Sequence, residues 1–109
     1  MADKYSDGKW DYPKSAYTVP QLLAAVPTAM AEYARAEAKK NNRDVVKGEC
    51  HLRYRTPTGT IVLKGIERGL GRLNQVKGPS SDQKARARAE LLNQRSKARK
   101  ALGKLRSTF

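Results

Sequence analysis

The stretch SSDQKARARAELLNQRSKARKALGKLRSTF, residues 80–109, decides how this chain is organised. It contains nine Lys and Arg residues against two acids, and so carries +7 of the net charge of +13 of the 109-residue chain. Ser80 and Gln83 have the spacing of a capping box, in which each residue bonds a backbone N–H of the other and starts a helix. We therefore expect residues 79–109 to form one long basic helix.

A narrow apolar stripe follows this predicted helix when its residues are placed at 100° each. Its leucines predict contact with protein, whereas the bases on the other faces predict contact with a polyanion. The docking leucines are Leu91, Leu102 and Leu105. The bases are Lys84, Arg86, Arg88, Arg95, Lys97, Arg99, Lys100, Lys104 and Arg106.

Charge is unevenly distributed along the chain. The net charge is 0 over residues 1–20, +1 over 21–44, +5 over 45–78 and +7 over 79–109. Net charge bears on partners and not on fold. The second half therefore favours a polyanion such as nucleic acid as its partner. An acidic protein surface, or solubility alone, are the alternatives.

Residues 1–17 contain four aromatic side chains among three lysines and three acids, with Gly8 and Pro13 interrupting any regular element. Aromatics between lysines can stack on unpaired bases. They can also anchor an extended arm on a protein surface, either of this chain or of a neighbour. Because the acids cancel the lysines here, we expect docking on protein. The residues are Tyr5, Trp10, Tyr12 and Tyr17.

Two helices separated by proline are expected next. Residues 18–21, TVPQ, have the form of another capping box and precede a short helix over 19–25. Pro27 stops or kinks that helix and suits the start of the next one, over 27–40. The candidates for protein docking on the second helix are Met30 and Tyr33.

The one strand-like region alternates apolar and polar residues over 49–55 and is followed by a Pro/Gly turn. This pattern predicts a β-hairpin over residues 46–64, in which 46–56 pairs with 60–64. The predicted buried face holds Cys50, Leu52 and Tyr54. The predicted cationic face holds Arg53 and Arg55, with His51.

A short helix over 66–75 is predicted by apolar residues four and three positions apart. Arg68 and Arg72 lie one turn apart on it and extend the cationic surface. We interpret Gly65, Gly69 and Gly71 as turn or close-packing positions, because their spacing fits no nucleotide-binding loop.

No set of residues points to catalysis. The only histidine, His51, and the only cysteine, Cys50, would face opposite sides of a regular strand, and the acids form no close pair. No metal-ligand spacing is present, and a single cysteine excludes an internal disulfide. We expect no enzyme activity, cofactor or metal.

Together these patterns predict an α+β fold that is mostly helical. It would comprise an extended docking arm (1–17), a small α+β domain (18–78) and the basic helix (79–109). There is no apolar run long enough for a membrane span and no signal-peptide pattern, so we expect a protein that lies inside the cell or within a particle.

The expected function is that of a structural or accessory protein of a nucleoprotein assembly, such as a ribosome-like or a virus or phage particle. The first half would dock on protein subunits, and the second half would contact nucleic-acid backbone without sequence specificity. The alternative is a protein–protein adaptor whose basic helix binds an acidic partner. A membrane-surface helix is a weaker third hypothesis, because the apolar stripe lacks Trp and Phe.

Overall fold

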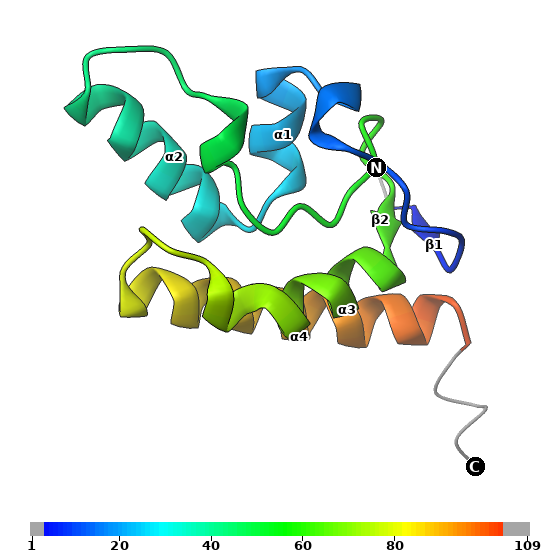
Figure 1. Cartoon of the computed structure of the whole chain (residues 1–109). Coiled ribbons are helices and arrows are strands. Elements are labelled where there is room, and N and C mark those ends of the chain that lie inside the picture. Colours follow the sequence, from blue (N-terminus) through cyan, green and yellow to red (C-terminus); the bar gives the residue numbers. More distant parts are fainter. Residues whose placement is uncertain (1–3, 104–109) are drawn as a thin grey trace.

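The computed structural model describes residues 4–103, and its longest element, helix α4, is the one on which α2 and α3 pack, while α1 packs on α2 (Figure 1). Helices α2 and α3 both lie against it, and the fold is α+β and mostly helical. The helices are α1 (Val19–Ala25), α2 (Thr28–Lys40), α3 (Leu63–Arg72) and α4 (Ser81–Ala101). The strands are β1 (Tyr5–Ser6) and β2 (Ile61–Val62), and single 3-10 turns lie at Lys14–Ala16, Lys47–Glu49 and Leu73–Gln75.

Both predicted capping boxes are confirmed. The Ser80 hydroxyl accepts from the Gln83 backbone N–H at 3.1 Å, and the Ser80 N–H donates to the Gln83 side chain at 2.9 Å. Thr18 and Gln21 make the same reciprocal pair at the start of α1. These bonds satisfy donors that a helix start otherwise leaves without partners, and so fix where α1 and α4 begin.

The predicted β-hairpin over 46–64 is confirmed only beside its turn, where the Thr56 N–H donates to the Thr60 carbonyl at 2.8 Å and the Val62 N–H to the Tyr54 carbonyl at 3.0 Å. The longer pairing of 46–56 with 60–64 is wrong. Strand β2 pairs instead in parallel with β1, in the register Tyr5↔Ile61 and Ser6↔Val62. Between Arg55 and Ile61 the structure has only an isolated antiparallel bridge, which closes the turn at 56–59. Helix α3 begins directly after β2, at Leu63, so the predicted second strand is shortened by a helix start.

The first half of the predicted hairpin fails for a physical reason. Leu52 has a φ of +66°, which a leucine adopts at a cost of roughly 1–2 kcal/mol and which interrupts an extended strand. The backbone N–H of Tyr54 donates to the Ala25 carbonyl at the end of α1, at 2.9 Å. The alternation of apolar residues therefore arises because an irregular segment packs on helices. It does not arise from a sheet.

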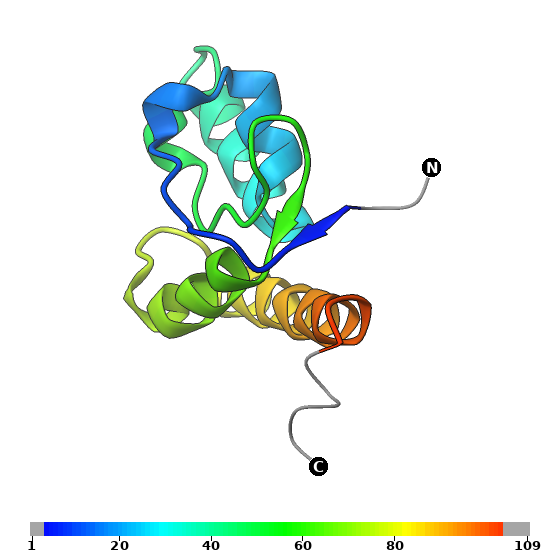
Figure 2. The same ribbon diagram turned by 90° about the vertical axis from the view of Figure 1, so that its right-hand side faces the viewer.

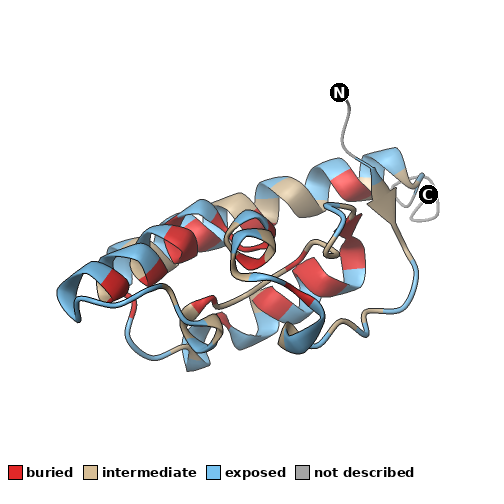
Figure 3. Ribbon diagram, turned by 90° about the horizontal axis from the view of Figure 1, so that it is seen from above, coloured by how far each residue is buried: buried red, intermediate tan, exposed pale blue. Residues whose placement is uncertain are grey.

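Two clusters of buried side chains form the core, and α4 contributes to both. Ala87 belongs to the cluster beneath α1 and α2, whereas Leu91 and Ala98 belong to the cluster beneath α3 and β2. Figure 3 shows the buried residues on the facing sides of the helices and exposed residues on their outer sides. The arm enters the same core, because Tyr17 is only 2% exposed.

The arm follows the rest of the chain closely. From β1 it passes over the start of α3 and then reaches the 3-10 turn before α1 (Figure 2). Its course is fixed at one end by pairing with β2 and at the other by Tyr17, whose hydroxyl donates to the Arg55 carbonyl. The arm thereby forms one wall of the site described next.

Candidate polyanion-binding site

The cationic half of the described chain has few acids, and each of them has a partner inside the protein. Residues 50–103 contain thirteen Lys and Arg residues and three acids. Glu67 pairs with Arg99 at 3.5 Å and Asp82 with Arg86 at 3.0 Å. Glu90 accepts hydrogen bonds from the Tyr54 hydroxyl at 2.9 Å and from the Thr28 backbone N–H at 3.0 Å. Residues 50–103 therefore carry a net charge of +10, and their acids face other groups of the protein.

Helix α4 presents its bases unequally. Arg86 is held by Glu32 at 2.7 Å and by Asp82, and these hydrogen bonds raise its pKa. It is therefore the α4 base that the protein itself neutralises most. Five others form no ion pair with any described residue. These are Lys84, Arg88, Arg95, Lys97 and Lys100.

Three of these bases, together with the ion-paired Arg99, lie on the side of α4 that borders α3. Lys84, Arg88, Arg95 and Arg99 lie four, seven and four residues apart, so that they share one side of α4. The ion pair between Arg99 and Glu67 shows that this side faces α3. We call Lys84, Arg88, Arg95 and Arg99 the α4 row. It is a line of cations along the edge where α3 and α4 meet.

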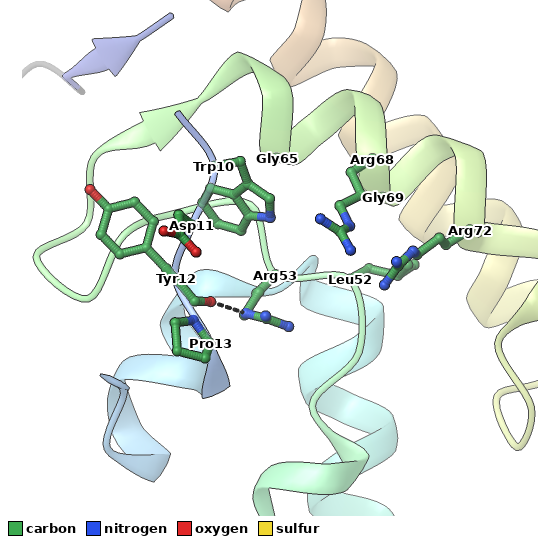
Figure 4. A pocket seen from close by; sticks show the side chains of 10 residues that line it. All are labelled: Trp10, Asp11, Tyr12, Pro13, Leu52, Arg53, Gly65, Arg68, Gly69 and Arg72. Carbon is green, nitrogen blue, oxygen red and sulfur yellow. Dashed lines mark hydrogen bonds between the residues drawn. The ribbon is translucent and has the colours of Figure 1, made fainter. Parts of the chain in front are cut away.

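A second group of cations surrounds a hollow of about 300 Å³ between the arm and α3 (Figure 4). The wall from the arm is residues 10–13, and the floor is residues 52–53. The wall from α3 is Gly65, Arg68, Gly69 and Arg72. We call this site the arginine hollow, after Arg53, Arg68 and Arg72, whose guanidinium groups point into it in Figure 4.

Trp10 reaches the hollow because residue 65 is glycine. A Cβ atom at Gly65 would lie 3.0 Å from two atoms of the Trp10 ring, closer than side chains normally approach. Gly69 is the next residue on the same side of α3 and makes room for Leu91 and Leu52. The interpretation as a close-packing position is confirmed for Gly65. A Cβ at Gly69 would make only ordinary contact with Leu91 and Leu52, and a Cβ at Gly71 would meet nothing within 4 Å.

Arg53 ties the arm to the floor of the hollow. Its Nε donates to the Tyr12 carbonyl at 2.9 Å, and its outer nitrogens face the hollow. The left-handed backbone at Leu52 precedes it directly, so local strain is placed at the point where Arg53 turns inward. Arg68 and Arg72 form no hydrogen bond or ion pair with other described residues.

The three arginines repel one another. Burial lowers the pKa of Arg53, and the nearby charges of Arg68 and Arg72 lower it further, while Tyr17 opposes this effect. A cluster of like charges that is partly withdrawn from water is relieved when an anion enters. The electrostatics of the hollow therefore favour a bound anion.

The remaining predicted polyanion contacts are placed elsewhere. The guanidinium of Arg55 lies 5.4 Å from the centre of the Tyr54 ring and donates to the Gly59 carbonyl at 3.4 Å, away from the hollow. Lys104, Leu105 and Arg106 lie outside the described residues. The sequence patterns did not single out Asp11, which also lines the hollow.

The predicted protein-docking residues pack mainly on the chain itself. Tyr17, Met30 and Leu91 are 2%, 0% and 0% exposed, so a separate protein cannot reach them in this structure. Tyr5, Tyr12 and Leu102 are half-buried against the two core clusters. Tyr33 is half-buried with its ring 5.8 Å from that of His51. In this structure the arm therefore docks on its own chain.

Cys50 and His51 do not form a reactive pair. Burial raises the pKa of the Cys50 thiol, which donates weakly to the Val46 carbonyl at 3.7 Å. Burial and the charge of Lys14 lower the pKa of His51. Within residues 4–103, no three His, Cys, Asp or Glu side chains gather in a way that would hold a metal ion. No helix in this part of the chain is both long and apolar enough to cross a membrane.

Comparison of the chain with protein-family models, with curated proteins and with solved structures found no match. The α4 row and the arginine hollow are therefore the features of the protein that point to a function.

Proposed function

We propose that this protein is a non-enzymatic structural or accessory component of a nucleoprotein assembly, such as a ribosome-like or virus-like particle. It contacts nucleic-acid backbone through the α4 row, the exposed bases of α3 and the arginine hollow. The observation that carries the proposal is that the acids of the second half interact within the protein whereas most of its bases do not. All three acids of residues 50–103 are engaged inside the protein, while most of the thirteen bases are not.

Backbone contact fits these residues better than reading of bases does. Arginine offers a planar fork that matches phosphate oxygens, and its charge persists at every physiological pH. The cations are spread along two helices at their edge, whereas base readout needs an element that enters a groove. Binding of this kind tolerates any sequence, which suits a component that packs many different segments of nucleic acid.

The direct test measures binding to dye-labelled duplex and single-stranded oligonucleotides by fluorescence anisotropy across a salt series. Each phosphate that is neutralised contributes about −0.9 to the slope of log K against log salt for a duplex, and about −0.7 for a single strand. With four to six contacts from the surface described, we expect a duplex slope of about −4 to −5. Absence of binding at about 50 mM salt would refute the proposal.

A matched pair of variants locates the surface. Lys84→Gln with Arg88→Gln removes two charges from the α4 row and should reduce the slope magnitude by about 2. Lys39→Gln with Lys40→Gln removes two exposed charges from the end of α2, outside the proposed surface, and should leave the slope unchanged.

A protein–protein adaptor remains the competing function, and the same experiment addresses it. An acidic polypeptide such as polyglutamate carries carboxylates in place of phosphates. An adaptor would bind it at least as tightly as it binds nucleic acid at equal salt. We expect the reverse, because three arginines around one hollow suit the oxygens of a phosphate.

A further inference from the structure

The arginine hollow differs from an ordinary basic patch because its charges converge on one point. Arg53, Arg68 and Arg72 come from two separate segments, and Figure 4 shows their guanidinium groups directed toward the same space. Asp11 is the only acid lining it, so the lining has a net charge of +2. A phosphate monoester carries about −1.5 to −2 at pH 7, whereas a phosphodiester carries −1.

We propose that the arginine hollow binds the terminal phosphate of a nucleic-acid strand. This inference rests on the proposed function and specifies which group of the nucleic acid the hollow takes. The rest of the strand would then lie along the α3 and α4 surface.

The number of acceptor oxygens favours a terminal phosphate over an internal one. A monoester has three terminal oxygens that are not bonded to a sugar, and each accepts strong hydrogen bonds. A phosphodiester within a strand has two. The three oxygens of a monoester can accept hydrogen bonds from all three guanidinium groups around the hollow. The two oxygens of a phosphodiester leave one guanidinium group with a weaker partner.

The donors in the hollow are available to a ligand. Arg68 and Arg72 are exposed and make no hydrogen bond with another described residue. Arg53 donates through Nε to the Tyr12 carbonyl and is also hydrogen-bonded to the Tyr17 side chain, and its remaining N–H groups face the hollow. The indole nitrogen of Trp10 is on the arginine side of its ring in Figure 4. A volume of about 300 Å³ is at the small end of ligand sites, enough for a phosphate with part of its nucleotide.

Trp10 also makes the inference directly measurable. It is the only tryptophan of the chain, so that the intrinsic fluorescence at tryptophan wavelengths reports on this hollow alone. A ring of Tyr12 lies 5.6 Å from it, and Gly65 covers one part of it. Occupation of the hollow should therefore change the Trp10 emission, while binding confined to α4 should not.

The experiment compares one single-stranded 10-nucleotide sequence in three forms: with a 5′-phosphate, with a 3′-phosphate and with hydroxyl groups at both ends. We expect at least one phosphorylated form to bind about tenfold more tightly than the hydroxyl form, as one added charge-assisted interaction implies. Only that form should change the Trp10 emission. Equal affinity of all three, with unchanged emission, would overturn the inference and leave the proposed function standing. Binding of none of them would overturn both.

Two variants of equal charge separate the hollow from the α4 row. Arg68→Gln with Arg72→Gln should abolish the higher affinity of the phosphorylated form. The hydroxyl form should lose only the affinity that two positive charges contribute by non-specific electrostatic attraction. Lys84→Gln with Arg88→Gln should weaken all forms by the same factor and preserve the ratio. Persistence of the ratio in the Arg68/Arg72 variant would overturn the assignment. Thermal unfolding of both variants checks that they fold, which we expect because none of the four substituted side chains is buried.

Discussion

The α4 row and the arginine hollow contain similar residues in opposite arrangements. In the α4 row four bases lie along one side of a helix, so each meets a different part of a long partner. In the hollow three arginines from two segments face one point, and the arm closes the space around them. A spread of charge favours a polymer, whereas convergence favours one compact anionic group. The difference lies in what surrounds the bases and not in their number.

The neutral arm makes this difference. Counted by charge, residues 1–20 contribute nothing to a polyanion site. In the structure Trp10 and the Tyr12 carbonyl form a wall and an anchor for Arg53. A segment without net charge therefore converts part of a basic surface into a concave site.

The largest predicted effect tests whether one core holds both regions. Leu91 is fully buried beneath α3, and one of its methyl carbons would lie 3.4 Å from a Cβ at Gly69, which belongs to the α3 wall of the hollow. Leu91→Ala removes three carbon groups and leaves a cavity, so we expect a loss of about 3 kcal/mol in the free energy of unfolding. Chemical denaturation measures it, and the α4 row and the hollow should lose binding together as the variant unfolds.

Leu102→Ala is the matched control. Leu102 is half-buried at the end of α4, so the same truncation should cost clearly less. If the two variants were equally stable, the packing of α4 on α3 would not be what positions the two cationic regions.

The next effect concerns the link between the regions. Tyr54 directly follows Arg53 of the hollow, and its hydroxyl donates a hydrogen bond to Glu90 of α4. Burial, and then the charge of Glu90, raise the pKa of Tyr54 from 10.0 to about 12. The folded state therefore keeps a proton that the unfolded chain loses above pH 10, and stability falls as the pH rises from 10 to about 12. The loss attributable to Tyr54 is up to about 3 kcal/mol.

Tyr54→Phe isolates this contribution, because lysines also titrate in that range. The variant keeps the ring and removes the hydroxyl, so its stability should be lower at pH 8 and should fall less steeply above pH 10. Parallel pH profiles for the two proteins would contradict the role of the Tyr54–Glu90 hydrogen bond.

A smaller effect distinguishes the two sides of α3. Gly71 is exposed with open space at its Cβ position, so Gly71→Ala should raise the free energy of unfolding by up to about 1 kcal/mol. Gly65→Ala gains the same helix propensity but forces the Trp10 ring to move. We expect it to shift the Trp10 emission and weaken binding of a terminal phosphate. Identical emission in the two variants would show that the ring does not depend on Gly65.

The sequence predicted α1, α2 and the start of α4 well because their signals are local, whereas α3 begins at Leu63, before the predicted start at residue 66. Capping boxes at Thr18 and Ser80 and the proline between α1 and α2 act within a few residues. The strand partner was missed because β1 and β2 are more than fifty residues apart, and alternation over 49–55 resembles a strand when the segment merely packs on helices. The hollow was predicted only in its parts. Arg53, Arg68 and Arg72 were identified as cations, but nothing local to them shows that Trp10 of the arm completes their site.

The smallest predicted effect bears on the charge balance of the hollow. Asp11 is exposed and lines the hollow beside the arm, where it opposes an incoming phosphate. Interactions between exposed charges are worth only a few tenths of a kcal/mol, so Asp11→Asn should tighten binding of a 5′- or 3′-phosphorylated strand by about twofold. Asp44→Asn, an exposed acid after α2 and outside the hollow, is the control and should change nothing. Because Asp11→Asn adds no donor fork, a gain at Asp11 alone would show that the phosphate enters the arginine hollow. Weaker binding would mean that the carboxylate holds the arginines in place, and that their convergence depends on an acid as much as on the arm.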